Sequence, residues 1–374
     1  MDISKTEKTS RPLSLKEKLR QESVQDFLSR TLANKTAVGP IVVELDPTTA
    51  CNLACHDCIS ANLLNQGGFE RERLKDLANE FVEAGVKAVV LIGGGEPMAH
   101  PEFGWILKYF HDAGLHTGVT TNGTLLKKFQ EECVTTKWLR VSVDAGTSEI
   151  FSEFRPHRSG KSQFDLVINN MREFAEKKTG LLGYSFLLLN KYDEKGEMVK
   201  SNAVDIYKAA KLAQEIGCDY FELKPAFDMM HFLQKQDSEV VQVVNSELEK
   251  AHSLKSEKFD IIAPFTLEEA LGGATTQIKS YNRCLTSELR TVVSPSGTYV
   301  CPYHRGNPSM KIGDATKDNF VELWSSKKRK EVMEKVNPQI HCSFHCIRHE
   351  SNLLLERMMA GEAVQSIPDF DRFI

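Results

Sequence analysis

Short apolar runs alternate along the chain with longer segments in which apolar residues recur every three or four positions. The short runs predict buried strands and the longer segments predict amphipathic helices. Strands are predicted at residues 41–45, 88–92, 117–120, 139–143, 181–189 and 220–223. Helices are predicted between them, at residues 71–84, 102–113, 164–177 and 203–216. Because no hairpin signal separates the strands, the pattern predicts an α/β protein with a parallel sheet, either closed as a barrel or open and doubly wound.

The alternation occupies only the middle of the chain, which predicts a division into segments. An amphipathic stretch at residues 15–32 ends at the Gly39-Pro40 break, and the alternation stops after Phe227. Pro295, Ser296 and Gly297 form a turn between two apolar runs, which predicts a β-hairpin over residues 290–300. The predicted segments are a helical extension (1–40), the strand–helix domain (41–235), a helical linker (236–283), a second small domain (284–350) and a tail (351–374).

Composition narrows the class of protein. The 374 residues are 41% hydrophobic, enough for a sizeable core, and the net charge of -4 gives no pull toward nucleic acid. The sequence has no apolar run long enough to span a membrane, and its first twenty residues are too polar for a signal peptide. We therefore expect a cytoplasmic protein that binds neither nucleic acid nor membrane. The nine cysteines are an odd set grouped at two places, which favours metal or cluster ligation over disulfides.

The first cysteine group follows the first predicted strand. Cys51, Cys55 and Cys58 form a C-x3-C-x2-C pattern on one short loop. Three thiolates can hold three irons of a [4Fe-4S] cluster and leave the fourth iron open to a ligand that is not protein. The alternative is zinc with His56 as a fourth ligand, but that residue is adjacent to Cys55, which makes the geometry awkward.

A glycine-rich turn follows the second predicted strand. Its sequence is Gly93-Gly94-Gly95-Glu96-Pro97, in which glycines permit close approach of a ligand and the carboxylate can bind an amine. With the cysteine pattern before it, this turn resembles the GGE motif of the radical S-adenosylmethionine (SAM) enzymes. The resemblance implies that Gly94, Gly95 and Glu96 bind SAM beside a [4Fe-4S] cluster. It also implies a partial (β/α)6 barrel similar to a TIM barrel.

Further positions extend the resemblance at the carboxyl ends of the predicted strands, where parallel α/β folds bind ligands. The positions that resemble the family's SAM pocket are Asn122, Ser142, Asp144 and Asn190, together with Arg155, which resembles an arginine that holds the SAM carboxylate. Each also has a structural alternative, as a turn, cap or surface residue. Asp57 departs from the family, which usually has an aromatic residue before the third cysteine.

The second cysteine group supplies four thiolates, the number that saturates a [4Fe-4S] cluster. It resembles the small α+β domain called SPASM, or its shorter form called twitch, which implies an auxiliary cluster on Cys284, Cys301, Cys342 and Cys346. Structural zinc on the same four cysteines is the alternative. The nearby histidines could replace a ligand or lie on the surface; they are His304, His341, His345 and His349. Cys133 and Cys218, which lie outside both groups, are predicted to be small buried hydrophobes.

The resemblance implies an enzyme that cleaves SAM to a 5'-deoxyadenosyl radical, which abstracts hydrogen from the substrate. Lys224, at the end of the sixth strand, is a candidate to bind the substrate or accept a proton, with a structural salt bridge as the alternative. We expect a small polar metabolite such as a sugar or aminocyclitol, oxidised through the auxiliary cluster, and an external electron donor such as flavodoxin or ferredoxin. The alternatives are a redox-neutral epimerase or eliminase, a peptide (RiPP) maturase, or a non-catalytic iron–sulfur electron carrier. The maturase is disfavoured because only about 40 residues precede the first strand, too few for a leader-binding domain.

Overall fold

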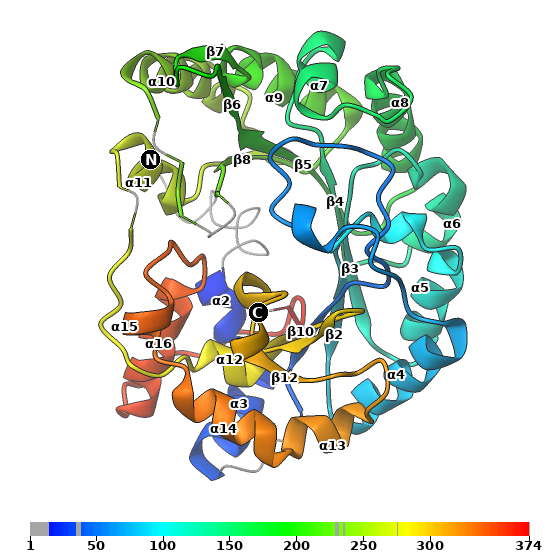
Figure 1. Cartoon of the computed structure of the whole chain (residues 1–374), viewed down its shortest axis with the longest axis vertical. Coiled ribbons are helices and arrows are strands. Elements are labelled where there is room, and N and C mark those ends of the chain that lie inside the picture. The colour runs from blue at the N-terminus through cyan, green and yellow to red at the C-terminus, as the bar shows by residue number, and fades with distance from the viewer. Residues whose placement is uncertain (1–14, 35–38, 229–231, 235, 275, 374) are drawn as a thin grey trace.

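The computed structural model describes residues 15–34, 39–228, 232–234, 236–274 and 276–373. Six parallel strands form a curved sheet in the order β1-β2-β3-β4-β5-β8, and helices line its outer side (Figure 1). Their bounds are β1 Val42–Leu45, β2 Ala88–Leu91, β3 His116–Thr121, β4 Trp138–Ser142, β5 Leu181–Leu188 and β8 Tyr220–Pro225. These are the six strands expected from the sequence, and the partial-barrel α/β fold is confirmed.

The helices outside the sheet are α4 (Arg71–Glu83), α5 (Phe103–Asp112), α6 (Gln130–Cys133), α7 (Ser148–Phe154), α8 (Phe164–Ala175) and α9 (Ile206–Ile216). Four of them, α4, α5, α8 and α9, agree with the predicted ranges to within a few residues, whereas α6 and α7 were not predicted. Their apolar faces pack on the strands, and the aromatic rings of Phe81 and Phe110 join α4 to α5 with centroids 6.3 Å apart. Cys133 and Cys218 lie in this core, as predicted.

A hairpin after β5 was not predicted, so the expectation that no hairpin occurs in the strand–helix region was wrong. It joins β6 (Asn190–Tyr192) to β7 (Met198–Ser201) in an antiparallel pair. Asp193 closes its turn by accepting the backbone N–H groups of Lys195 and Glu197. The strands are too short and too rich in charged residues to give an apolar alternation.

The sheet continues at both edges beyond the six strands. β9 (Asp260–Ile262) pairs in parallel with β8, after α10 (Ser238–His252). At the other edge β10 (Arg290–Ser294) pairs in parallel with β1, followed by the antiparallel strands β11 (Gly297–Tyr299) and β12 (Lys311–Gly313). The predicted hairpin at residues 290–300 is present. One sheet thus runs through the predicted boundary at residue 284, and the division into segments stays a prediction.

The remaining helices surround this C-terminal part of the sheet. They are α11 (Phe265–Leu271), α12 (Thr286–Leu289), α13 (Phe320–Ser325), α14 (Lys327–Lys335), α15 (Pro338–His341) and α16 (His349–Met359). α13 packs on α4, with the rings of Phe320 and Phe81 edge to face at 4.8 Å. Arg73 of α4 donates to the carbonyl oxygen of Ala315 at 2.7 Å. The C-terminal segment is therefore fixed against the barrel.

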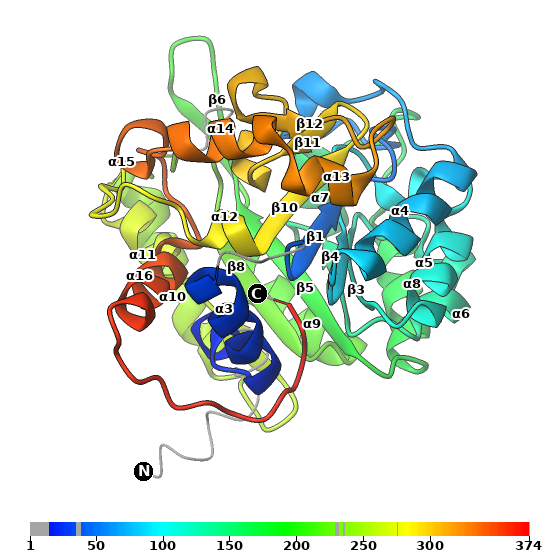
Figure 2. The same ribbon diagram turned by 90° about the horizontal axis from the view of Figure 1, so that it is seen from below.

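The two ends of the described chain meet beneath the barrel. Figure 2 shows the C-terminus beside α3 (Glu22–Asn34), which follows α2 (Leu15–Leu19). Lys18 forms a buried ion pair with Asp371 at 3.0 Å, and the ring of Phe373 lies edge to face with Trp138 of β4 at 5.5 Å. These contacts close the amino-terminal end of the strands. Among the described residues, the longest helices are too short and too polar to cross a bilayer.

We expect Phe373→Ala to lower the free energy of unfolding by about 3 kcal/mol, because it removes a buried ring from a packed site. Phe373 is only 3% exposed. Urea unfolding of the purified variant measures the loss. Phe370→Ala, which removes a half-buried ring from the same tail, is the matched control and should cost less. Equal losses in the two variants would show that the tail contributes no specific packing at this position.

Candidate active site

The first cysteine loop follows β1 at its carboxyl end. Hydrogen bonds within the loop and to two other segments of the chain hold it there. Thr49 donates its N–H to the Gly67 carbonyl at 2.8 Å, which folds residues 49–67 into a closed loop. Ala54 donates to the Pro156 carbonyl at 2.9 Å. The side chain of Asn52 donates to the Thr124 hydroxyl at 2.7 Å. The loop is thereby attached to the end of β3 and to the segment after α7.

The three thiols of this loop are all free and half-buried. Burial raises the pKa of Cys55 to about 11, and Asp144 and the other two thiols of the loop add to the rise. Burial also raises the pKa of Cys51, to which Glu96 and Cys58 add. Arg155 opposes this, and its Nη1 lies 3.9 Å from the Cys55 sulfur. Clustered thiols beside one cation are a donor set that suits an iron–sulfur cluster.

The alternative zinc site at this loop is not favoured. The His56 side chain is 77% exposed and contacts Asp57 instead, with 3.6 Å between Nδ1 and Oδ1. Among the residues that the structure describes, no three His, Cys, Asp or Glu side chains converge as a single ion requires. A cluster does not need such convergence, because each thiolate binds its own iron.

The glycine-rich turn lies directly against the cysteine loop. A Cβ atom on Gly95 would stand 2.3 Å from the Ala50 carbonyl oxygen, so only glycine fits at this contact. Glu96 donates its N–H to the same carbonyl at 2.8 Å. The close approach therefore places the backbone of Glu96 against Ala50, the residue before Cys51.

The Glu96 carboxylate is buried and already has three hydrogen-bond donors from the chain. Oε1 accepts from the Thr121 hydroxyl at 2.7 Å and from the Met98 N–H at 3.0 Å, and Oε2 accepts from the Asn122 N–H at 2.6 Å. Burial raises its pKa despite these donors. A carboxylate offers about four acceptor positions, so one remains for a further donor.

Asn122 connects the end of β3 to the cysteine loop. Its amide nitrogen donates to the Asn52 side-chain oxygen at 2.8 Å, and its own oxygen accepts from the Thr124 hydroxyl at 2.7 Å. It is therefore a positioning residue for the loop, beyond the turn role considered from the sequence.

Asp144 and Arg155 form a buried ion pair beside the thiols. Asp144 Oδ2 lies 2.6 Å from both Nε and Nη2 of Arg155, and Oδ1 accepts the Leu187 N–H at 2.8 Å. Burial lowers the pKa of Arg155, but Asp144 and the Cys55 thiolate raise it by more, so the net pKa lies above its ordinary value. Asp144 has φ of +58°, a conformation that Asp tolerates better than most residues. The surface-charge interpretation of Arg155 is wrong, because its side chain is only 12% exposed.

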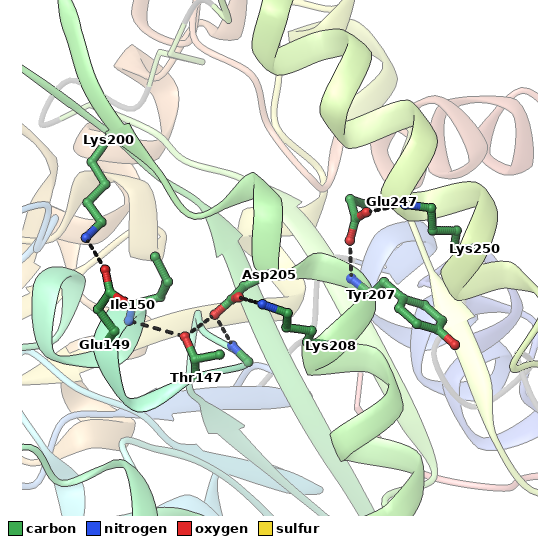
Figure 3. Close-up of polar contacts among 10 residues, drawn as sticks. Thr147, Glu149, Ile150, Lys200, Asp205, Tyr207, Lys208, Glu247 and Lys250 are labelled. Atoms are coloured by element: carbon green, nitrogen blue, oxygen red, sulfur yellow. Dashed lines mark hydrogen bonds and ion pairs between the residues drawn. The ribbon is translucent and has the colours of Figure 1, made fainter.

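Contacts on the outer side fix the helix that carries Arg155. Figure 3 shows that the Asp205 carboxylate accepts from the Thr147 hydroxyl at 2.7 Å, at the start of α7. Lys200 of β7 bonds Glu149 of α7 at 2.8 Å. Arg155 directly follows α7 as its C-cap residue, so these contacts help to position it beside the cysteine loop.

Ser142 and Asn190 do not join this group through any described side-chain contact. Ser142 ends β4, where it is half-buried and paired in register with Ser185. Asn190 begins β6, and its amide nitrogen donates to Gln236 at 2.7 Å. The structure thus brings together the three cysteines, Glu96, Asn122, Asp144 and Arg155, and it places these two residues at the rim.

Lys224 lies on the inner face of the sheet in a charged network with Glu222 and Arg140. Its Nζ lies 3.2 Å from Glu222 Oε2, and Nη1 of Arg140 lies 3.1 Å from the same oxygen. Burial and the nearby Arg140 lower the pKa of Lys224. Burial alone would raise the pKa of Glu222, but Lys224 and Arg140 together lower it by more. The predicted salt-bridge alternative for Lys224 is present. Two cations share one carboxylate, so these three groups together carry a net positive charge.

The second cysteine group also comes together, although its members span more than 60 residues of sequence. The Ser287 hydroxyl donates to the Cys284 sulfur at 3.2 Å, and the Arg348 N–H donates to the Cys346 sulfur at 3.4 Å. Burial raises the pKa of Cys342 to about 12 and raises the pKa of Cys301 far above its ordinary range. The other cysteines of the group add to both shifts. Four thiols that affect one another in this way are a donor set that suits one iron–sulfur cluster.

The four histidines near this group differ in position. His304 is 6% exposed and its Nε2 lies 3.6 Å from the Cys342 sulfur, whereas His345 is fully buried beside Glu269. The surface interpretation is therefore wrong for these two. His349 stacks on Tyr281, and His341 accepts the Asn337 N–H at 3.0 Å. Lys279 and Asn352 also border the group and were missed, because no spacing rule links them to the cysteines.

A small cavity of about 130 Å³ lies between the two cysteine groups. It is lined on one side by Ile59, Ser60, Asn62 and Leu63, and on the other by Pro302, Arg305 and Gly306. Arg305 is buried and pairs with Asp46, which follows β1, at 2.7 Å. The segment after Cys301 therefore forms part of the wall around the first site.

Comparisons with known proteins agree with this geometry. The sequence model of the radical SAM superfamily matches residues 45–201. The chain is 25% identical over 301 residues to the mycofactocin maturase MftC of Mycobacterium tuberculosis strain CDC 1551 / Oshkosh, across 77% of this chain and 71% of MftC. It is 32% identical over 124 residues to the AdoMet-dependent heme synthase of Methanosarcina barkeri strain Fusaro / DSM 804, across 31% of this chain and 35% of that protein.

Solved structures share the fold. Streptococcus suis SuiB bound to its precursor peptide SuiA aligns with a TM-score of 0.60 and 15% identity, over 87% of this chain and 76% of SuiB. Native anSMEcpe with bound AdoMet aligns with a TM-score of 0.57 and 18% identity, over 79% of this chain and 83% of that one.

Proposed function

We propose, on the premise that the chain belongs to the radical SAM superfamily, that this enzyme modifies a peptide by abstracting hydrogen from a carbon–hydrogen bond. The observation that carries the proposal is the similarity to the maturase MftC over 77% of the chain, together with a second group of four cysteines that lie near enough to raise one another's pKa. Our expectation of a sugar or aminocyclitol substrate gains no support from these relatives. The peptide alternative replaces it as the main proposal.

The first site is proposed to hold a [4Fe-4S] cluster on Cys51, Cys55 and Cys58. When bound, this cluster supplies the electron that cleaves SAM and so generates the radical that attacks the substrate. Glu96 has one acceptor position left for the amino group of SAM, and Arg155 presents its guanidinium beside Cys55 for the carboxylate. The remaining residues proposed to line the SAM pocket are Gly94, Gly95, Asn122, Ser142, Asp144 and Asn190.

The second group is proposed to hold an auxiliary [4Fe-4S] cluster on Cys284, Cys301, Cys342 and Cys346. A saturated cluster offers no open iron for substrate, so we propose that it takes up an electron and that the product is more oxidised than the substrate. The first electron is proposed to come from an external flavodoxin or ferredoxin. We also retain the cytoplasm as the proposed location, because nine free cysteines suit a reducing compartment.

The inner face of the barrel is proposed to bind the substrate. Arg140 and Lys224 share the Glu222 carboxylate, so the excess positive charge there suits a carboxylate or hydroxyl group of the substrate. A peptide supplies such groups at its side chains and at its C-terminus.

The proposal is tested by adding substrates to anaerobically reconstituted, reduced protein and measuring 5'-deoxyadenosine. We expect synthetic peptides, taken from short reading frames beside its gene, to raise 5'-deoxyadenosine formation at least tenfold over SAM alone. Mass spectrometry of the same samples should show one peptide changed in mass.

Two results would contradict the proposal in different ways. Stimulation by sugars or aminocyclitols, with no effect of the peptides, would restore the small-metabolite reading and keep the radical chemistry. A protein that never cleaves SAM, although it holds its iron, would reject the enzymatic proposal altogether in favour of an electron carrier.

A further inference from the structure

Lys279 is a buried cation that lacks a carboxylate partner. It is 2% exposed, and it lies in the segment between α11 and α12. Its Nζ donates to the Gln277 carbonyl at 3.1 Å, to the Gln277 side-chain oxygen at 2.6 Å and to the Phe344 carbonyl at 2.8 Å. These acceptors are all neutral. Within the described ranges, no Asp or Glu oxygen lies within the 4.0 Å of an ion pair with this ammonium.

A buried ammonium that has only neutral acceptors is costly unless negative charge lies nearby. The strongest source of negative charge for Lys279 is the second cysteine group, whose thiols would become thiolates on binding a cluster. Burial lowers the pKa of Lys279. Four groups raise it, and in order of decreasing effect they are Cys346, Cys342, Glu269 and Cys284. Phe344, whose carbonyl accepts from Nζ, lies between Cys342 and Cys346 in the sequence. The ammonium is therefore attached to the loop that carries two of the four thiols.

We propose that Lys279 is the counter-charge of the second cysteine group and that it raises the reduction potential of the cluster held there. This inference rests on the proposed auxiliary cluster. Four thiolates give such a cluster a net negative charge, and reduction adds one more. A fixed cation in a site of low dielectric stabilises the more negative, reduced form more strongly. Lys279 is thus a positioning residue that makes the cluster a better electron acceptor for the substrate radical.

The test is a potentiometric titration of the reconstituted enzyme, followed by electron paramagnetic resonance. The second cluster is identified as the signal that SAM does not change. Lys279→Met removes the charge and keeps the length of the side chain, and Lys279→Arg keeps the charge. Gln277→Met is the matched control, because Gln277 bonds both Lys279 and the Cys346 N–H but carries no charge.

We expect Lys279→Met to shift the reduction equilibrium of the second cluster at least tenfold toward the oxidised form, which is about 59 mV for one electron. Lys279→Arg and Gln277→Met should each shift it by less than half as much. Equal shifts in Lys279→Met and Gln277→Met, or no shift in Lys279→Met, would overturn the proposal, since loop geometry rather than charge would then set the potential.

Iron analysis covers the case in which a variant loses the second cluster. Loss in Lys279→Met with full loading of Lys279→Arg supports the counter-charge, whereas loss in all three variants shows a purely structural role. Zinc in the wild-type protein at these thiols would reject the auxiliary cluster and this inference together, while SAM cleavage by the same sample would leave the radical chemistry intact.

Discussion

Replacing Cys51, Cys55 and Cys58 together by Ala is expected to abolish SAM cleavage and to leave about half of the iron on the chain. These thiols form one loop, and no other described cysteine lies on it. The four cysteines of the second group would saturate their cluster, so the remaining iron has no open position for SAM. Iron analysis and 5'-deoxyadenosine formation measure the two effects.

Two control variants separate this effect from general damage. Cys218→Ala removes a buried thiol from the core, far from both groups in the fold, and should keep both clusters and SAM cleavage. Cys342→Ala with Cys346→Ala should keep SAM binding at the first site. An electron paramagnetic resonance spectrum of the triple variant that changes on addition of SAM would mean that the two cysteine groups have exchanged roles.

The sequence predicts the elements whose burial is complete. β2 is a run of apolar residues and β1 is apolar except for Glu44, and every residue of both strands is buried. The helices that flank them show a clear apolar face. β9 and the β6–β7 hairpin escaped prediction because their few apolar residues stand among polar or charged ones, as the sequences DII, NKY and MVKS show. Strands this short depend on a neighbour for pairing and leave no periodic pattern of their own.

The site divides in the same way. The cysteines and Glu96 are recognisable because their spacing within one loop or turn carries the chemistry. The partner of Arg155 is not recognisable, because nothing in the sequence between Asp144 and Arg155 shows that the two side chains meet. The partnership exists because α7 returns Arg155 to the end of β4. Lys279 is still harder to predict, since it meets its thiols only after the chain has passed through β10 to β12 and α13 to α15.

The Asp144–Arg155 pair gives the largest expected loss of stability in the site. We expect Asp144→Ala to lower the free energy of unfolding by about 3–5 kcal/mol, the range for removing one partner of a buried ion pair. The change leaves the Arg155 guanidinium without its counter-charge and the Leu187 N–H without its acceptor. It also places Ala at a φ of +58°, a conformation that Ala adopts poorly.

Asp144→Asn is the matched variant, because it keeps the acceptor for Leu187 and tolerates the backbone conformation while it removes the charge. The free energy of unfolding should fall much less in Asp144→Asn than in Asp144→Ala. Adding Arg155→Met to Asp144→Ala should recover part of the lost stability, because it removes the unpaired cation. Anaerobic urea unfolding of identically loaded proteins measures all three. If Arg155→Met gave the Asp144→Ala protein no recovery of stability, the guanidinium would have found another partner. The Cys55 sulfur, 3.9 Å from Nη1, is the group placed to be that partner.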